Sequence, residues 1–294
     1  MIVDKRVSGK TRIMGVLGNP VEHSISPQLH NTLSTRLGID TVYVPFRVEK
    51  ADLDNAVKGL KALNVLGFNV TIPYKKDIMK FIDDNTKEAL LMGAVNTVKN
   101  IDGRLYGYNT DAEGFSRSFK EESGATFKGK NILIIGAGGV SRAIAVKTAI
   151  EGAKHISLVN RTISKALDIA GIIENNYETG IRCLDSEDKK YKDAFSEADI
   201  VINTTSVGMY PEIEGCPVDK KINFMSHQII YDVIYNPAKS KLLKKAEKSG
   251  CKAMNGLGML FYQGIYAYEI WTGIKLSEDI IKEIYKSFVN ILKN

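Results

Sequence analysis

The sequence has few cysteines and none in a pattern: Cys183, Cys216 and Cys251 are far apart in 294 residues. An odd number without CxxC spacing argues against a disulfide framework and against a zinc site, so we expect reduced thiols and no metal. No apolar, uncharged stretch is as long as the about 18 residues that a transmembrane helix needs. Residues 1–6 lack the apolar core of a signal peptide. We therefore expect a cytoplasmic protein without a membrane partner.

The excess of positive over negative charge is also small, since the formal net charge is only +6. The basic residues do not gather with aromatic residues, and the lysine-rich run at 239–248 is typical of the solvated face of a helix. We therefore expect no nucleic-acid partner. With 44% hydrophobic and 25% charged residues, the chain has the composition of a globular protein and the length of two ordinary domains. The sequence leaves the oligomeric state open, and a homodimer is one possibility.

The first 110 or so residues alternate apolar strand-like and helix-like segments, which predicts an α/β domain with a mostly parallel sheet. The expected strands are 13–17, 41–48 and 67–71, the expected helices are 27–37, 50–63 and 75–91, and a hairpin is expected from 94–99 and 104–108 around Asp102-Gly103. A connecting helix is expected at 111–122.

A second α/β run begins at Lys130. The expected strands are 131–135, 155–159, 199–203 and 229–233, with a helix at 142–151 after the first of them. The tail from 257 to 294 has helical spacing throughout. We find no internal repeat and no low-complexity linker.

A glycine-rich loop follows the strand 131–135 and precedes the helix. It consists of Gly136, Ala137, Gly138, Gly139 and Val140. The first glycine permits a tight turn, and the second lets backbone N–H groups approach a pyrophosphate at the helix N-terminus. Ser141 replaces the usual third glycine and is small enough for close helix packing. Between a strand and a helix, this loop predicts a dinucleotide site in a Rossmann-type domain.

The end of the next strand favours NADP over NAD. NAD-binding enzymes place an acidic residue there for the ribose 2′-hydroxyl, whereas this strand ends in Asn160-Arg161-Thr162. Arg161 can hold a 2′-phosphate through charge-assisted bonds, and Ser164 and Lys165 can add donors. The alternative, an ordinary surface arginine, remains open.

Four polar segments of the first half lie where strands end, at 19–27, 69–75, 93–97 and 107–111. Ligands of open α/β sheets bind beyond the carboxyl ends of the strands. Ser24 and Ser26 can meet a carboxylate there, and Lys75 and Asp111 can form a proton-transfer pair. Purely structural alternatives remain open: Lys75 as a surface lysine, Asp111 as a helix N-cap, and the two serines as helix-start residues. His23 and His30 are interpreted as structural.

Together these segments resemble the shikimate dehydrogenase family. The resemblance rests on HSxSP at 23–27, NVTxPxK at 69–75, GAVNT at 93–97, GxNTD at 107–111 and GAGGxxRA at 136–143. It continues through 160–162, 203–209, 232–237 and 255–260, so it covers about residues 12 to 270 in order.

The resemblance implies reversible, NADPH-dependent reduction of 3-dehydroshikimate to shikimate in aromatic amino acid biosynthesis. It implies a substrate-binding catalytic domain of residues 1–112 plus 257–294, to which the C-terminal helices return, and an NADP-binding Rossmann domain of residues 113–256. It assigns catalysis to Lys75 and Asp111, and further substrate contacts to Ser24, Ser26, Thr71, Asn96, Tyr235 and Gln263. It assigns cofactor contacts to 136–140, Asn160, Arg161, Thr162, Ser164, Lys165, Val233 and Gly256.

Other functions remain open from the sequence. A quinate/shikimate dehydrogenase of broader specificity, or an aminoshikimate dehydrogenase, would share these motifs. A non-catalytic regulator that binds shikimate or NADP would be expected to lose Lys75 and Asp111, and both are present.

Overall fold

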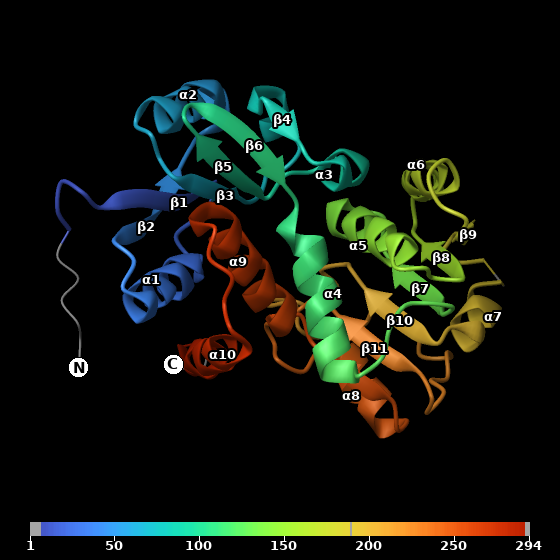
Figure 1. Ribbon diagram of the computed structural model, residues 1–294. Helices are drawn as coiled ribbons and strands as arrows, with labels where there is room; N and C mark the ends of the chain where they lie inside the picture. The colour runs from blue at the N-terminus through green and yellow to red at the C-terminus, as the bar shows by residue number, and fades with distance from the viewer. Residues whose placement is uncertain (1–6, 189, 292–294) are drawn as a thin grey trace. The chain divides into compact units, whose positions relative to one another are not determined.

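The computed structural model describes residues 7–188 and 190–291. Residues 1–6, on which the signal-peptide expectation rests, lie outside the described part. The chain forms two compact units, Met1–Thr110 with Gln263–Asn294, and Asp111–Tyr262, each built on a six-stranded sheet (Figure 1). No helix within the described residues has the length and apolarity to cross a membrane.

The sheet of the first unit has the strand order β2-β1-β3-β5-β6-β4. Its strands are β1 (Arg12–Gly18), β2 (Thr41–Arg47), β3 (Gly67–Val70), β4 (Asp84–Asn85), β5 (Thr97–Ile101) and β6 (Arg104–Tyr108). β1 pairs in parallel with β2 and β3, and β5 is antiparallel to β3 and β6. The predicted hairpin is confirmed: Asp102 and Gly103 form its turn with φ of 50° and 79°, the positive values that a two-residue turn requires.

The helices of the first unit follow the predicted order with two corrections. They are α1 (Ser26–Leu37), the 3₁₀ turn η1 (Lys50–Asp52), α2 (Leu53–Ala62), the 3₁₀ turn η2 (Asp77–Phe81), α3 (Lys87–Met92), the later part of α9 (Leu257–Thr272) and α10 (Glu278–Ile291).

The single helix predicted at 75–91 is wrong. Polar residues at 83–86 interrupt it: the Asp83 carboxylate accepts the Leu105 N–H at 2.7 Å, and Thr86 caps α3. The continuous helical tail is also wrong, because Gly273, at φ 74°, ends α9 and separates it from α10.

Buried side chains fill both faces of the first sheet. One face carries an apolar cluster that includes Phe68, Val98 and residues of α2 and α3. On another side, the buried His30 of α1 stacks on Tyr43, with ring centroids 4.4 Å apart, and lies 5.1 Å from the Trp271 ring. The Trp271 indole N–H donates to the Val98 carbonyl at 2.8 Å. His30 is thus a core residue of this unit, in agreement with the structural interpretation.

His30 makes the stability of the protein depend on pH. Burial lowers the pKa of His30 from its usual value of 6.5 to about 3, so the folded chain keeps the imidazole neutral while the unfolded chain takes up a proton below pH 6.5. The free energy of unfolding therefore falls as the solution is acidified, by about 2 kcal/mol from this residue between pH 7 and pH 5. In His30→Phe, which keeps an aromatic ring there, urea unfolding at the two pH values should show that loss reduced by a similar amount. An identical loss in both proteins would contradict this account.

The second unit has a fully parallel sheet in the order β12-β11-β10-β7-β8-β9. Its strands are β7 (Asn131–Ile135), β8 (His155–Val159), β9 (Gly180–Leu184), β10 (Ile200–Asn203), β11 (Ile229–Asp232) and β12 (Lys252–Met254). Numbered along the chain, this is the 3-2-1-4-5-6 order of a Rossmann sheet, whose direction of winding reverses between β7 and β10. The predicted two-domain α/β fold is confirmed.

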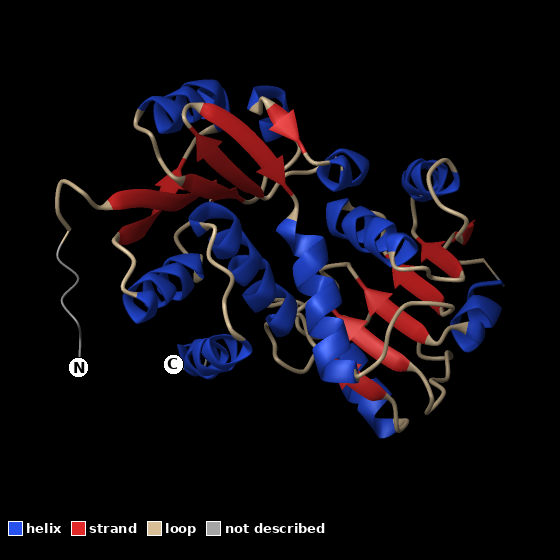
Figure 2. Ribbon diagram, viewed as in Figure 1, coloured by secondary structure: helices blue, strands red, loops and turns tan. Residues whose placement is uncertain are grey.

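Strand alternation places two apolar layers on the faces of this sheet. Ile132 and Ile134 face a cluster with α4 (Thr110–Ser123), α5 (Gly139–Ile150) and α6 (Ile163–Glu174). Leu133 and Ile135 face the opposite cluster, with α7 (Lys190–Glu197) and α8 (Lys241–Lys248). Figure 2 shows these helices flanking the strands. The period of two is the one expected for strands buried on both faces.

Candidate active site

Strand direction brings five predicted substrate residues to one edge of the first sheet. Ser24 and Ser26 follow the carboxyl end of β1, and Thr71 and Lys75 follow the carboxyl end of β3. Because β5 runs antiparallel to β3, Asn96 just before β5 lies at this same edge. This is the edge at which open α/β sheets bind ligands.

The two serines lie at the start of α1, but neither holds its N-cap position. Ser26 is the first residue of α1, and the N-cap position is held by Ile25 without a side-chain bond. The Ser24 hydroxyl accepts the Ser26 N–H at 3.3 Å. The helix-start alternative therefore does not account for the Ser26 hydroxyl, and both side chains are only partly buried.

Lys75 is held by its backbone and its neighbour. Its carbonyl accepts the Val95 N–H at 2.8 Å, and the buried Tyr74 donates its hydroxyl to the Val48 carbonyl at 2.7 Å. The Lys75 side chain is half-buried, whereas that of Lys76 is exposed. The segment that carries Lys75 is thus fixed to the end of β2.

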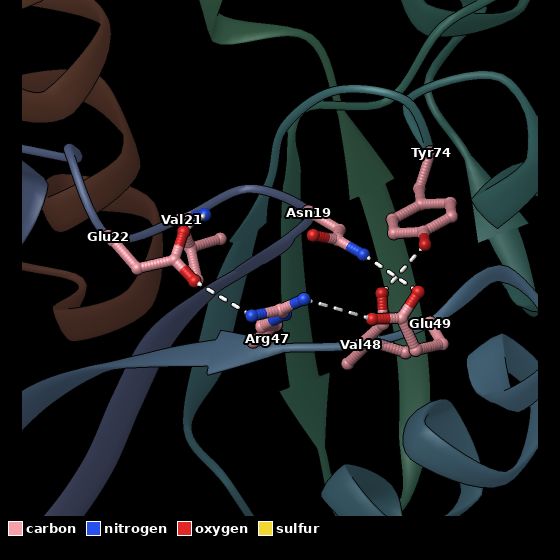
Figure 3. A network of polar contacts seen from close by, with 7 residues as sticks. All are labelled: Asn19, Val21, Glu22, Arg47, Val48, Glu49 and Tyr74. Atoms are coloured by element: carbon pink, nitrogen blue, oxygen red, sulfur yellow. Dashed lines mark hydrogen bonds and ion pairs between the residues drawn. The ribbon is translucent and has the colours of Figure 1, made fainter.

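A polar network joins the loop after β1 to the same end of β2 (Figure 3). Arg47 lies between Glu22 and Glu49, 3.3 Å from an oxygen of each, and Asn19 donates to Glu49 at 2.9 Å. The Arg47 and Glu49 side chains are about 60% exposed, at 62% and 61%. Exposed pairs of this kind contribute little to stability, so the network mainly restricts the loop that leads to Ser24.

Asn96 is buried and fixes the start of α4. Its amide nitrogen donates to the Thr110 hydroxyl at 3.0 Å, and its oxygen accepts the Thr110 N–H at 2.7 Å. Asp111 is the second residue of α4, so it is not the N-cap of this helix. Lys75 and Asp111 fall in different compact units, and their pairing stays a prediction.

The two remaining substrate candidates lie on other elements. Gln263 is buried on α9, and a Cβ on the next residue, Gly264, would stand 2.6 Å from the side chain of Leu29 on α1. This places the α9 backbone beside the first turns of α1. Tyr235 follows β11 and is 41% exposed.

In the second unit, the glycine loop lies at the point where the winding of the sheet reverses. Gly136 has φ 110°, and a Cβ there would stand 2.6 Å from the Thr204 hydroxyl. Ser141 closes the loop: its hydroxyl accepts the Gly138 N–H at 3.1 Å and contacts the Thr204 hydroxyl at 2.5 Å. Thr204 in turn donates to the Ile135 carbonyl at 2.7 Å.

Ser141 therefore does more than permit close packing. It ties the loop after β7 to the loop after β10, a role that the sequence analysis did not give to Thr204. The sequence contains a signal for this role, since Thr204 directly follows a strand in the segment 203–209. Gly138 and Gly139 are exposed, and the first N–H groups of α5 have no helical acceptor of their own.

The Arg161 loop follows β8 and opens α6. Asn160 shapes it by donating to the Thr162 carbonyl at 2.8 Å. Arg161 and Thr162 are exposed, as are Ser164 and Lys165 in the first turn of α6. A helix N-terminus, a guanidinium and an ammonium form a surface suited to a phosphate.

Val233 and Gly256 come together at the ends of β11 and β12. A Cβ on Gly256 would stand 2.0 Å from the Val233 carbonyl oxygen, so only glycine fits. Beside them, the buried Asp232 accepts from Asn203 at 2.9 Å and from Ser240 at 2.6 Å. Burial raises the pKa of Asp232.

Three family models match consecutive parts of the chain. They are the shikimate dehydrogenase substrate binding domain at residues 16–98, shikimate / quinate 5-dehydrogenase at 118–210, and the shikimate 5′-dehydrogenase C-terminal domain at 256–284.

Full-length relatives agree with these matches. A shikimate dehydrogenase (NADP(+)) of Methanococcus vannielii is 45% identical over 98% of this chain and 100% of its own. The structure of a Listeria monocytogenes shikimate 5-dehydrogenase in complex with shikimate and NAD is 38% identical, with a TM-score of 0.90 over 95% of this chain and 98% of that one. A shikimate dehydrogenase in complex with NADP+ is 40% identical, with a TM-score of 0.87 over 96% and 97%.

Proposed function

This chain belongs to the shikimate dehydrogenase family, and we propose that it interconverts 3-dehydroshikimate and shikimate through Lys75, with NADP as its cofactor. It is an NADP-dependent oxidoreductase that acts on a CH–OH group. The observation that carries the assignment of residues is the edge of the first sheet, where the ends of β1 and β3 and the start of β5 gather hydroxyl, amide and ammonium groups.

The second unit has the features that NADP needs. Gly138 and Gly139 have no heavy atom within 4 Å of a Cβ position, which leaves their backbone open to a ligand, whereas Gly136 and Gly256 pack closely against Thr204 and Val233. We assign the pyrophosphate to residues 136–140, the 2′-phosphate to Arg161 with Asn160, Thr162, Ser164 and Lys165, and the nicotinamide end to Val233 and Gly256. The bound cofactor supplies or accepts the hydride.

Lys75 is assigned the transfer of a proton to and from the oxygen on C3 of the substrate. In the reducing direction, C3 of the substrate receives the hydride and its oxygen becomes an alkoxide, which takes a proton from the Lys75 ammonium. In the oxidising direction, neutral Lys75 accepts that proton from the C3 hydroxyl. Asp111 is assigned to orient Lys75 and a neighbouring hydroxyl of the substrate.

The other residues are assigned to the two ends of a small hydroxylated acid. Ser24 and Ser26 would donate hydrogen bonds to its carboxylate, which suits hydroxyl donors at the start of α1. Tyr235 is assigned a further substrate contact. Thr71, Asn96 and Gln263 would bind the ring hydroxyls. Fixed donors and acceptors of this kind discriminate between ring acids that differ by one hydroxyl.

A comparison of substrates tests this function. At saturating NADP+, the absorbance of reduced nicotinamide should give a kcat/KM for shikimate that is about tenfold or more above that for quinate. A higher value for quinate would favour the dehydrogenase of broader specificity. Binding of shikimate without turnover of either acid would favour the non-catalytic regulator.

A further inference from the structure

Behind the proposed substrate edge lies a chain of polar side chains that are almost completely buried. Its members are Tyr43 of β2, Asn69 of β3, Asn96, Thr97 of β5 and Thr110, and none is more than 6% exposed. We call these five residues the buried polar chain. Only Asn96 has a proposed contact with substrate, so the presence of the other four needs another explanation.

Hydrogen bonds run continuously from β2 to β5. The Tyr43 hydroxyl donates to the Asn69 side-chain oxygen at 2.8 Å, although β1 lies between their strands. The Asn69 amide nitrogen then donates to the Thr97 hydroxyl at 3.0 Å and to the Asn96 carbonyl at 3.1 Å. These hydrogen bonds connect β2 to β5 through the side chain of Asn69 on β3.

The far end of the buried polar chain sets the orientation of the Asn96 amide group. The Asn96 oxygen accepts from the Thr97 hydroxyl at 3.1 Å as well as from the Thr110 N–H, and the Thr97 and Thr110 hydroxyls lie 3.0 Å apart. Rotation of the Asn96 side chain would break these bonds inside a low-dielectric environment, where unmatched polar groups are costly.

The near end of the buried polar chain reaches Ser26. Burial raises the pKa of Tyr43, and a hydrogen bond with the Ser26 side chain opposes that rise. The Tyr43 backbone is also fixed to α1, since its N–H donates to the Asn31 side chain and its carbonyl accepts from that side chain, both at 2.9 Å. Ser26 is the first residue of the same helix.

We propose that Tyr43 and Asn69 are positioning residues, which hold the Ser26 hydroxyl and the Asn96 amide at a fixed separation that matches the carboxylate and a ring hydroxyl of one substrate molecule. This inference rests on the proposed function. Neither residue touches the reacting atoms. Their effect is on substrate affinity, because a rigid ring acid meets both ends only when the separation is preserved.

Tyr43→Phe isolates the role of the hydroxyl, since the ring that stacks on His30 is kept. We expect the KM for shikimate to rise about tenfold, because the net contribution of one hydrogen bond corresponds to about a tenfold change in affinity. The change in kcat should be smaller. The KM for NADP+ should stay unchanged, because the buried polar chain lies wholly in the first unit while the glycine loop lies in the second.

Tyr268→Phe is the matched control. Tyr268 is also fully buried in the first unit, and its ring centroid lies 6.0 Å from that of His30. Its hydroxyl donates to Ser34 at 3.3 Å, away from the buried polar chain. Thermal unfolding of both variants measures the structural cost. If Tyr43→Phe and Tyr268→Phe lose similar stability but only the former raises the KM for shikimate, the positioning role is supported. If neither raises it, the inference is wrong.

A double-mutant cycle tests the link to Ser26. In a Ser26→Ala background, Tyr43→Phe should raise the KM for shikimate much less than it does in the wild type, since the positioned hydroxyl is already gone. Additive effects would overturn the inference. If Tyr43→Phe does not fold, Thr97→Val removes the next hydroxyl and should raise the same KM, and Thr97→Ser should restore it. Turnover of shikimate by the wild type tests the proposed function separately.

Discussion

Replacing Lys75 by alanine is expected to lower kcat for shikimate oxidation by about 10²-fold or more, the scale of a lost general acid–base group. Without Lys75, the C3 hydroxyl must give up its proton to water while the hydride leaves. The KM for NADP+ should change little, because Lys75 and the glycine loop belong to different units. Steady-state rates at saturating concentrations of both substrates measure the effect.

The adjacent Lys76 offers a matched control. It has the same charge and side chain but is exposed, so Lys76→Ala should keep kcat near the wild-type value. If Lys75→Ala keeps its kcat and only raises the KM for shikimate, Lys75 binds substrate without transferring a proton. An equal loss of kcat in both variants would contradict the assignment as well.

Replacing Arg161 by alanine is expected to weaken NADPH binding by about 1.5–3 kcal/mol, the range of hydrogen bonds to charged groups. Binding of NADH should hardly change, because NADH has no 2′-phosphate for the guanidinium to hold. Titration of the free protein with each cofactor, followed by nicotinamide fluorescence, gives both dissociation constants.

Lys192→Ala provides the control for general charge. Lys192 is an exposed cation on α7, which packs on the opposite face of the Rossmann sheet from α6. Its loss should leave both dissociation constants unchanged. Equal weakening of NADPH and NADH in Arg161→Ala would mean that Arg161 does not recognise the 2′-phosphate, and the surface-arginine alternative would then hold.

The sequence predicts most of this fold because its signals are local. The glycine loop between a strand and a helix, and the Asp102-Gly103 turn, depend on backbone geometry that neighbouring residues determine. The wrong helix at 75–91 has the opposite origin, a contact between residues far apart in the sequence. Its apolar spacing is helical, but Asp83 forms a bond with Leu105, which lies 22 residues away and is brought near only by the sheet.

The proposed site divides in the same way. Residues in the segments that follow strands, such as Lys75 and Ser26, can be predicted from the sequence because open sheets bind ligands beyond strand ends. Tyr43 and Asn69 cannot, because each acts through a partner on another strand. A tyrosine within a strand is typical of a core position, and only the strand order shows that Tyr43 reaches Asn69 across β1.

We propose above that this chain transfers a hydride between shikimate and NADP. The most direct test is kcat/KM for NADP+ and for NAD+ on the unmodified protein at saturating shikimate, followed by the absorbance of reduced nicotinamide. We predict turnover with both cofactors and a kcat/KM for NADP+ at least about tenfold higher, since the Arg161 surface contributes binding energy only to the phosphorylated cofactor. Equal values, or a preference for NAD+, would contradict the cofactor assignment, and no turnover with either cofactor would contradict the proposed hydride transfer.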